Sequence, residues 1–111
     1  MNINQKELVL LPYPFSDMER TKVRPALIVS NNVFNKQGND CVVVPLTSLI
    51  KDQQYSVIIG QQDLCEGTLL KTSRIRADKL FSIEKNLIIM KIGIIDDKKF
   101  EEIRAEIIKL F

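Results

Sequence analysis

The chain has 111 residues, of which 45% are hydrophobic and 27% charged, and a formal net charge of +2. This length fits one domain, so a single domain over residues 1–111 is expected. So small a positive excess is not that of a protein coating a nucleic-acid duplex, which must neutralise many phosphates. No apolar run reaches the roughly 18 residues that span a bilayer. The first residues lack a signal-peptide pattern, so a cytoplasmic protein with no membrane segment is expected.

The sequence lacks the residues and motifs that several classes of enzyme require. It contains no histidine, and Cys41 and Cys65 do not have the spacing of metal ligands. The sequence therefore predicts free cysteines in a reducing compartment, no metal and no cofactor. Nucleophile pairs that use histidine are excluded, and no Walker-type glycine-rich loop is present. Acid–base chemistry must use Asp, Glu, Lys, Arg or Tyr.

Short runs rich in Leu, Val and Ile, separated by turn residues, predict six or seven short strands. The first two, 8–12 and 24–30, flank a charged loop at 17–23. One short helical turn is expected at 31–35 and a loop at 61–67. The remaining strands are expected at 41–46, 55–59, 68–75, 80–83 and 87–95.

The end of the chain predicts a helix that begins at Asp96 or Asp97, whose carboxylates can cap free N–H groups. Phe100, Ile103, Ile107 and Leu110 or Phe111 recur at helical spacing and form an apolar stripe, which is expected to pack on the sheet. Short strands with a terminal helix predict a mainly β sandwich or small barrel.

Two of the candidate functional sites lie at strand ends. Arg24 opens the second strand, and a guanidinium there can hold a phosphate and stabilise charge that develops in a transition state. The alternative is a surface arginine beside Pro25. Thr47 and Ser48 follow the third strand, where a hydroxyl can bond a phosphate oxygen or a ribose 2′-OH, or merely cap a turn.

A third candidate is the alternating segment 74–78. Strand alternation puts Arg74, Arg76 and Asp78 on one face, with Ile75 and Ala77 on the other. A cation and a carboxylate on one face can act as electrostatic stabiliser or acid and as base. The alternative is a solvent-facing ion pair worth about 0–1 kcal/mol.

The charged loop is the fourth candidate. Arg20, Lys22 and Arg24 are spaced by two, so an extended backbone would put them on one face, which suits an anion. Glu19 is either a base or a solvated charge that offsets Arg20 and Lys22.

RNA cleavage needs none of the missing parts, because the nucleophile is the substrate's own 2′-OH. The protein need only align that hydroxyl, neutralise the transition state and assist proton transfer. Arginine side chains, a hydroxyl and a carboxylate are the kinds of group that can perform these three tasks.

Four motifs in order resemble the MazF/PemK (Kid) family of toxin endoribonucleases. They are P-Y-P-F-S-D at 12–17, R-P-A-L-I-V-S at 24–30, V-V-V-P-L-T-S at 42–48 and L-L-K-T-S-R-I-R-A-D at 69–78. The resemblance implies an SH3-like barrel of the CcdB/PemK type with a C-terminal helix, and a homodimer. It further implies the toxin of a type II toxin–antitoxin system, inhibited by a cognate antitoxin with an acidic tail.

The activity that the resemblance implies is metal-independent, sequence-specific cleavage of single-stranded RNA, often mRNA, leaving a 2′,3′-cyclic phosphate. Arg24 matches the family's R-P arginine, Thr47 its P-x-T threonine, and Arg76 with Asp78 the R-x-D pair of the PemK/Kid branch. These four are the predicted catalytic residues. The predicted substrate-binding residues are Glu19, Arg20, Lys22, Ser48 and Arg74, with Glu19 where some MazF-branch members carry a loop glutamate.

The chain departs from the family pattern at two places. Lys6-Glu7 stands where many members have Gly-Asp, and the first-loop histidine of some PemK members is missing. If that histidine stabilises the transition state in those members, either Arg20 or Lys22 substitutes for it here or the activity is lower. A threonine–arginine and an aspartate–arginine scheme both remain open. Two other functions also remain open: a small-barrel binding module without catalysis, and a toxin of the same barrel type that inhibits a protein such as gyrase.

Overall fold

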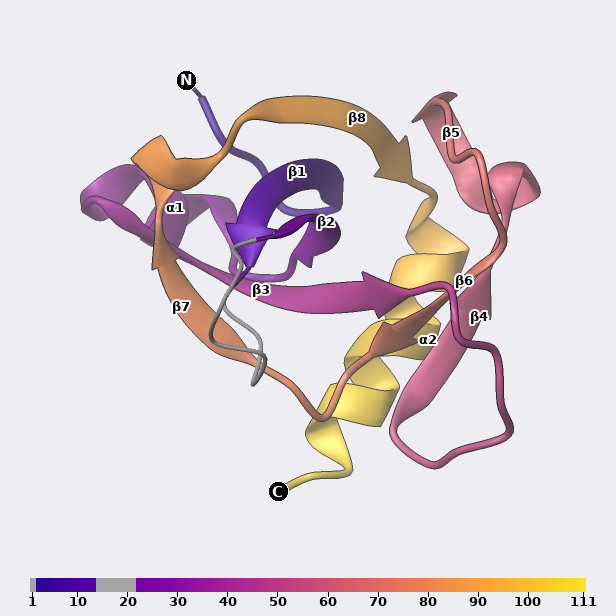
Figure 1. The fold of residues 1–111 in the computed structure, drawn as a ribbon. Helices are drawn as coiled ribbons and strands as arrows, with labels where there is room; N and C mark the ends of the chain where they lie inside the picture. Colours follow the sequence, from indigo (N-terminus) through magenta and orange to yellow (C-terminus); the bar gives the residue numbers. More distant parts are fainter. Residues whose placement is uncertain (1, 14–21) are drawn as a thin grey trace.

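The computed structural model describes residues 2–13 and 22–111. Within them the first half of the chain forms β1 (Glu7–Tyr13), β2 (Lys22–Ile28), α1 (Asn32–Gln37), β3 (Asp40–Thr47) and β4 (Ser56–Ile59). The second half forms the 3-10 turn η1 (Gln61–Asp63), β5 (Leu64–Gly67), β6 (Ser73–Arg76), β7 (Phe81–Glu84), the 3-10 turn η2 (Lys85–Leu87), β8 (Met90–Ile95) and α2 (Asp97–Ile108). Figure 1 shows these elements, with α2 lying against one side of a curled sheet.

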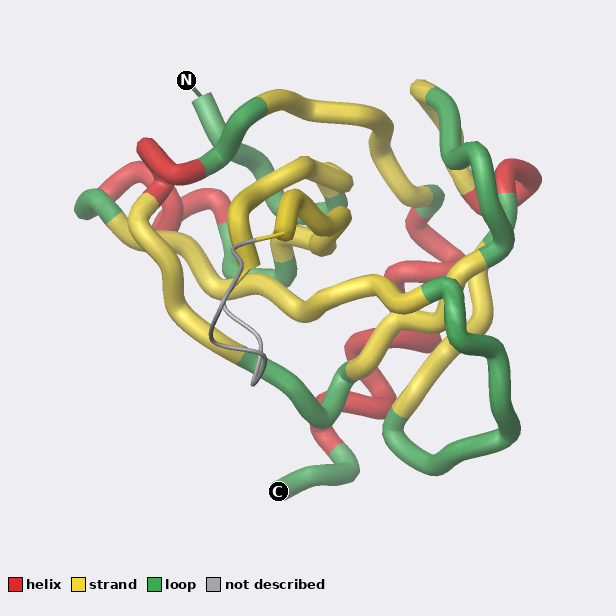
Figure 2. Tube along the Cα trace, viewed as in Figure 1, coloured by secondary structure: helices red, strands yellow, loops and turns green. Residues whose placement is uncertain are grey.

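The strands of the described residues form one antiparallel sheet in the order β4-β6-β3-β2-β1-β8-β5. β7 pairs with the first half of β3, and β6 pairs with its end. The sheet curls around β1 and β2, as the strand trace in Figure 2 shows. This partly open barrel with a C-terminal helix confirms the mainly β, small-barrel fold that the sequence predicts.

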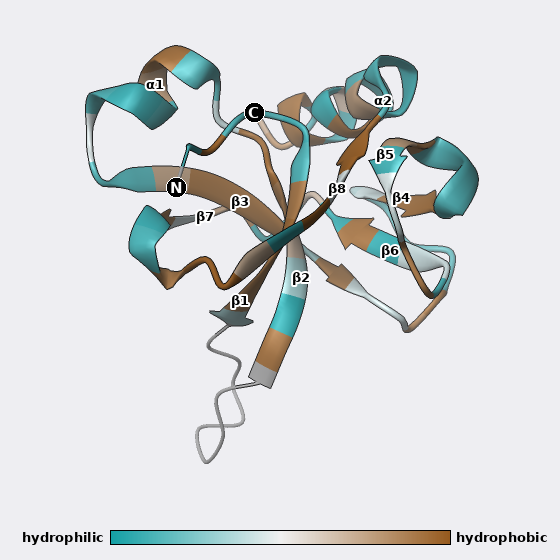
Figure 3. Cartoon of the chain, turned by 90° about the horizontal axis from the view of Figure 1, so that it is seen from above, coloured by the Kyte–Doolittle hydropathy of each residue, from teal (hydrophilic) through white to brown (hydrophobic). Residues whose placement is uncertain are grey.

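The sheet buries apolar side chains on both faces, because successive residues of a strand point to opposite sides. One core contains Val9, Ala26, Ile28 and Val43, and it is closed by Ile83 of β7. Figure 3 shows the hydrophobic character of β3 and β8, in contrast to the largely hydrophilic α1. Both faces of the central strands are therefore occupied, which fixes their register.

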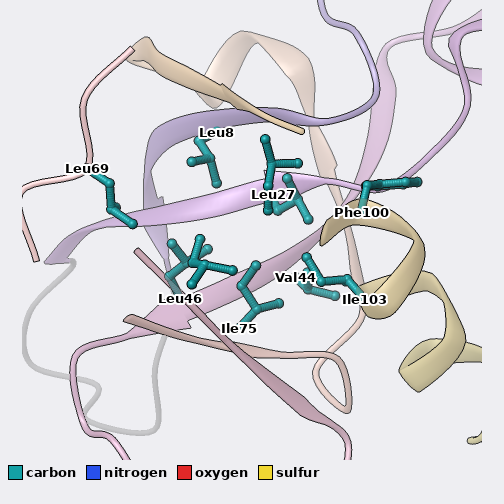
Figure 4. Close-up of a cluster of buried hydrophobic side chains, with 10 residues drawn as sticks. Leu8, Leu27, Val44, Leu46, Leu69, Ile75, Phe100 and Ile103 are labelled. Atoms are coloured by element: carbon teal, nitrogen blue, oxygen red, sulfur yellow. The ribbon is translucent and has the colours of Figure 1, made fainter. Parts of the chain in front are cut away.

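The second core lies between the other face of the sheet and α2. Phe100 and Ile103 of α2 pack against Leu27, Val44 and Ile75, as Figure 4 shows. This contact confirms that the stripe of the terminal helix packs on the sheet.

The beginning of α2 agrees with the sequence-based expectation, and its end does not. Asp96 Oδ1 accepts a hydrogen bond from Lys99 N at 2.7 Å, which is the expected N-cap. The apolar stripe stops at Ile107, because the helix ends at Ile108, and Phe111 is 93% exposed. Extending the stripe to Leu110 or Phe111 was wrong. No helix in the described residues is long and apolar enough to cross a membrane.

The segment between β4 and β6 differs most from the sequence-based expectation. Residues 61–67, expected as a loop, form η1 and then β5, which pairs with β8. Of residues 68–75, expected as one strand, only 73–75 belong to β6 (Ser73–Arg76), and Leu70 in the preceding connection is 92% exposed. The break occurs at Gly67, whose φ of +91° lies in a region that L side chains rarely adopt.

We expect Gly67→Ala to lower the free energy of unfolding by about 1–3 kcal/mol, since the positive φ becomes strained. An added Cβ would also lie 2.2 Å from Ile92 O and 2.3 Å from Gly93 Cα. Urea denaturation measures the change. The matched control is Gly38→Ala, where a Cβ meets nothing within 4 Å. Equal destabilisation by both substitutions would contradict this account of Gly67.

Candidate active site

Arg24 on β2 and Thr47 on β3 lie on the same face of the sheet. Ala26 pairs with Pro45 across these two strands. Arg24 is two residues before Ala26, and Thr47 is two residues after Pro45. Because side chains alternate along a strand, all four share one face. Strand register therefore places two of the predicted catalytic residues on one face of neighbouring strands, although 23 positions separate them in the sequence.

Strand β6 adds two arginines to this face. Arg74 pairs directly with Thr47, and Arg76 lies two residues further along the same strand. Ile75, between them, points into the core beneath α2. The face thus combines three guanidinium groups and a hydroxyl from three neighbouring strands, and we call Arg24, Thr47, Arg74 and Arg76 the arginine face.

Asp78 joins the arginine face through Arg76. Arg76 Nη2 donates to Asp78 Oδ2 at 2.8 Å, and Nε donates to Oδ1 at 3.3 Å. The two side chains are 28% and 31% exposed, so an incoming anion can reach them. A bidentate guanidinium–carboxylate pair presents the edge that a phosphate also prefers, so a phosphate can compete with Asp78 for Arg76.

The Thr47 hydroxyl accepts a hydrogen bond from Leu49 N at 3.2 Å. A hydroxyl that accepts one bond still has its own proton to donate to a second partner. Arg74 Nε donates to Leu49 O at 3.2 Å, so residue 49 is held through both its N–H and its carbonyl. This local network fixes the turn that carries Thr47 and Ser48. Sequence reasoning did not identify Leu49, because only the pairing of β3 with β6 brings its carbonyl to Arg74.

Arg74 is only 2% exposed, in contrast to Arg76 on the same strand. Its Nη1 is buried and has no hydrogen-bond partner among the described residues. None of the ion pairs within that part of the chain involves Arg74. Burying a cation without an opposite charge costs free energy, so this guanidinium is expected to lower the stability of the fold.

The remaining predicted residues are placed as follows. Ser48 is exposed and lines a cavity of about 330 Å³ that Arg24 also lines. Lys22 begins β2, but its side chain is not described. Glu19 and Arg20 lie outside the described residues, so their predicted contacts with substrate stay predictions.

Neither cysteine is one of the residues of the arginine face. Both thiols are free, as the sequence predicted. Cys41 belongs to the core of the β7 side, and burial raises the pKa of its thiol to about 11, so it is protonated and inert at neutral pH. Among the described residues, no three His, Cys, Asp or Glu side chains are grouped closely enough to hold a metal ion.

Comparison with known proteins identifies relatives over almost the whole chain. A family model described as a PemK-like, MazF-like toxin of type II toxin–antitoxin system matches residues 4–111. No curated protein sequence matches.

Two solved structures illustrate the similarity in fold. An endoribonuclease from a Mycobacterial species, solved in complex with its cognate antitoxin, has 20% identity and a TM-score of 0.78, covering 96% of this chain and 92% of that one. MazF from Deinococcus radiodurans has 20% identity and a TM-score of 0.79, covering 99% of this chain and 96% of that one. At such identities the likeness establishes the fold, and that fold is the predicted one.

We expect Arg74→Met to leave the free energy of unfolding unchanged or to raise it by about 1–2 kcal/mol. The substitution removes a buried cation and keeps most of its apolar volume. The matched variant two positions away, Arg76→Met, breaks a partly exposed ion pair and should cost no more than about 1 kcal/mol. Urea denaturation compares the two. A loss of 2 kcal/mol or more for Arg74→Met would mean that its bond to Leu49 O outweighs the burial of charge.

Proposed function

This chain belongs to the PemK-like, MazF-like family of toxins of type II toxin–antitoxin systems, and we propose that it is an endoribonuclease acting on single-stranded RNA, including mRNA. The observation that carries the proposal is the arginine face, with Asp78 attached to it through Arg76. It supplies cations and a hydroxyl on one face of neighbouring strands, and a carboxylate that is bound to one of the cations. Phosphodiester cleavage in RNA requires those three kinds of group.

The proposed reaction is an internal transesterification. The 2′-oxygen forms a bond to the adjacent phosphorus, and the bond from phosphorus to the 5′-oxygen of the next nucleotide breaks. The products are a 2′,3′-cyclic phosphate and a 5′-hydroxyl. No metal takes part in this scheme, because the arginines compensate the extra negative charge of the pentacoordinate transition state.

Each catalytic residue has one proposed role. Arg24 and Arg76 stabilise charge on the phosphate, since a guanidinium does not readily give up a proton. Thr47 donates its hydroxyl proton to a phosphate oxygen. Asp78 accepts the proton of the 2′-OH, and the departing 5′-oxygen takes a proton from water. Sequence alone left the threonine–arginine and aspartate–arginine schemes open, and this assignment uses both groups.

The Arg76–Asp78 pair must separate before Asp78 can act as a base. In the structure both carboxylate oxygens accept hydrogen bonds from Arg76. A phosphate that takes over the same guanidinium edge frees the carboxylate at the moment when the substrate is in place. Binding of the substrate and generation of the base are thereby coupled.

The proposed partners follow the family. We place single-stranded RNA across the arginine face, with Ser48, Arg74, Lys22, Arg20 and Glu19 as further substrate-binding residues. The toxin would form a homodimer, and a cognate antitoxin would cover the RNA site with an acidic segment. Light scattering of the toxin alone, and of a mixture with its antitoxin, measures both associations.

A second candidate is a module that binds RNA but does not cleave it. Two observations favour it: the Thr47 hydroxyl already caps a turn, and Asp78 is already paired with Arg76. Each residue therefore has a structural role that explains its presence without catalysis.

The deciding experiment incubates the purified protein with a single-stranded RNA in excess EDTA. We expect discrete fragments that end in a 2′,3′-cyclic phosphate and begin with a 5′-hydroxyl, identified by mass spectrometry. A 2′-O-methyl RNA of the same sequence is the control, since it lacks the nucleophile. RNA that is bound but stays intact at high protein concentration would favour the binding module.

Single substitutions test the assigned roles. Arg24→Ala and Arg76→Ala should each lower the cleavage rate by about 10²-fold or more, the loss typical of a preorganised group that stabilises charge. Arg104→Ala, which changes an exposed arginine of α2, is the matched control and should cleave at the native rate. Circular dichroism verifies folding. A folded Arg24→Ala or Arg76→Ala protein with full activity would remove that residue from the mechanism.

A further inference from the structure

The cavity that Arg24 shares with Ser48 has a volume of about 330 Å³. Its lining is largely apolar and includes Leu10, Pro25, Leu46 and Leu69, which we call the apolar floor. Leu10 pairs with Pro25 across β1 and β2, so these two side chains lie on one face of the sheet. Arg24 is the neighbour of Pro25, so its side chain leaves the backbone on the opposite face. The cavity therefore lies on the other side of the sheet from Thr47.

Two features connect the cavity to the arginine face. Ser48 follows Thr47 directly and lines the cavity, so neighbouring residues contribute to the two sites. The pairing of β2 with β3 ends at Ala26 and Pro45. Arg24 lies beyond this end, and its long side chain lines the cavity. A strand of RNA with one phosphate at Arg24 can thus place its neighbouring nucleotide in the cavity.

The lining of the cavity has the charge that a nucleotide requires. Among the described residues that line it, Arg24 and Lys71 are ionisable and none is acidic. Four other cavities in the described part of the molecule each include a glutamate. Positive charge above an apolar floor suits a flat, uncharged ring that carries a phosphate.

Hydroxyl groups supply the means to distinguish one base from another. Ser48, Thr68 and Ser73 line the cavity. The hydroxyls of Ser48 and Thr68 can donate and accept hydrogen bonds, whereas that of Ser73 donates within the chain and can accept. The edges of nucleobases differ in their pattern of donors and acceptors, so such groups read base identity in single-stranded RNA.

The wall formed by residues 68–71 and 73 is held by hydrogen bonds within the chain before any ligand binds. Thr68 N donates to Ile92 O at 3.0 Å, and Leu69 N donates to Gln61 Oε1 at 2.7 Å. Ser73 Oγ donates to Lys71 O at 3.0 Å. A preformed wall lowers the entropy cost of binding, which distinguishes a built site from a chance depression.

We propose that this cavity is a base subsite: it holds the nucleobase next to the cleaved phosphate and thereby sets the sequence preference of the enzyme. The inference rests on the proposed function. Lys71 contacts the phosphate of the bound nucleotide, whereas Thr68 and Ser48 contact its base. The volume, small for a ligand site, fits one nucleotide.

The test compares cleavage of RNA oligonucleotides that differ only in the base on either side of the scissile bond. For the wild type we expect kcat/KM to depend strongly on one of these bases. Thr68→Val and Ser48→Ala should reduce that dependence by about tenfold, since they remove hydrogen bonds to the base. Lys71→Ala should lower kcat/KM for all bases alike and weaken its salt dependence. Ser82→Val, at an exposed position of β7, is the matched control.

A second variant and a binding measurement separate this inference from the proposed function. Ser48→Phe places a ring at the exposed mouth of the cavity and should weaken binding of a non-cleavable 2′-O-methyl oligonucleotide by about tenfold or more. Wild-type cleavage with an unchanged base preference in every variant would overturn the subsite but leave the nuclease intact. Base-dependent binding without cleavage would support the subsite and reject the nuclease. A cavity that takes an acidic peptide but no oligonucleotide would overturn the subsite.

Discussion

The register of β3 against β2 and β6 determines how the two cores and the arginine face are arranged. Thr47 lies opposite Arg74 on one side, and Pro45 lies opposite Ala26 on the other. A slip of one residue in either pairing would turn every side chain of the moved strand to the opposite face. The arginine face would disperse, and Leu46 would leave the core beneath α2. Packing of two apolar cores on the two faces of the same strands makes such a slip prohibitively costly.

The same arrangement explains how a chain of modest net charge can present a strongly cationic site. Arg24 comes from β2 and Arg74 and Arg76 from β6, and the sheet places these two strands on either side of β3. Asp78 is the carboxylate held at this face, and it is held by one of the arginines. The buried guanidinium of Arg74 adds a cost that core packing must offset. In return, Arg74 Nε donates a hydrogen bond to Leu49 O and so fixes the turn beside Thr47.

Consecutive residues at the end of β3 divide two tasks between the faces of the sheet. Thr47 belongs to the arginine face, and Ser48 lines the cavity with the apolar floor. Chemistry on the phosphate and recognition of a base would therefore be adjacent yet made by different side chains. Residues 68–71 and 73 form one wall of the cavity, and none of them belongs to the arginine face. Substitutions in this wall could therefore change base recognition without changing the catalytic residues.

Local patterning alone determined the early strands, the central strand at 41–46 and the capped terminal helix, because alternation, Pro and Asp are readable within a few residues. It also named the arginines, the hydroxyls and Asp78. The sequence did not reveal that 61–67 contains a strand, since β5 has little apolar alternation and exists through its pairing with β8. Nor did it separate the buried Arg74 from the accessible Arg76, because burial depends on what covers a face. Convergence of these groups depends on contacts between residues distant in the chain, and only the tertiary structure provides those.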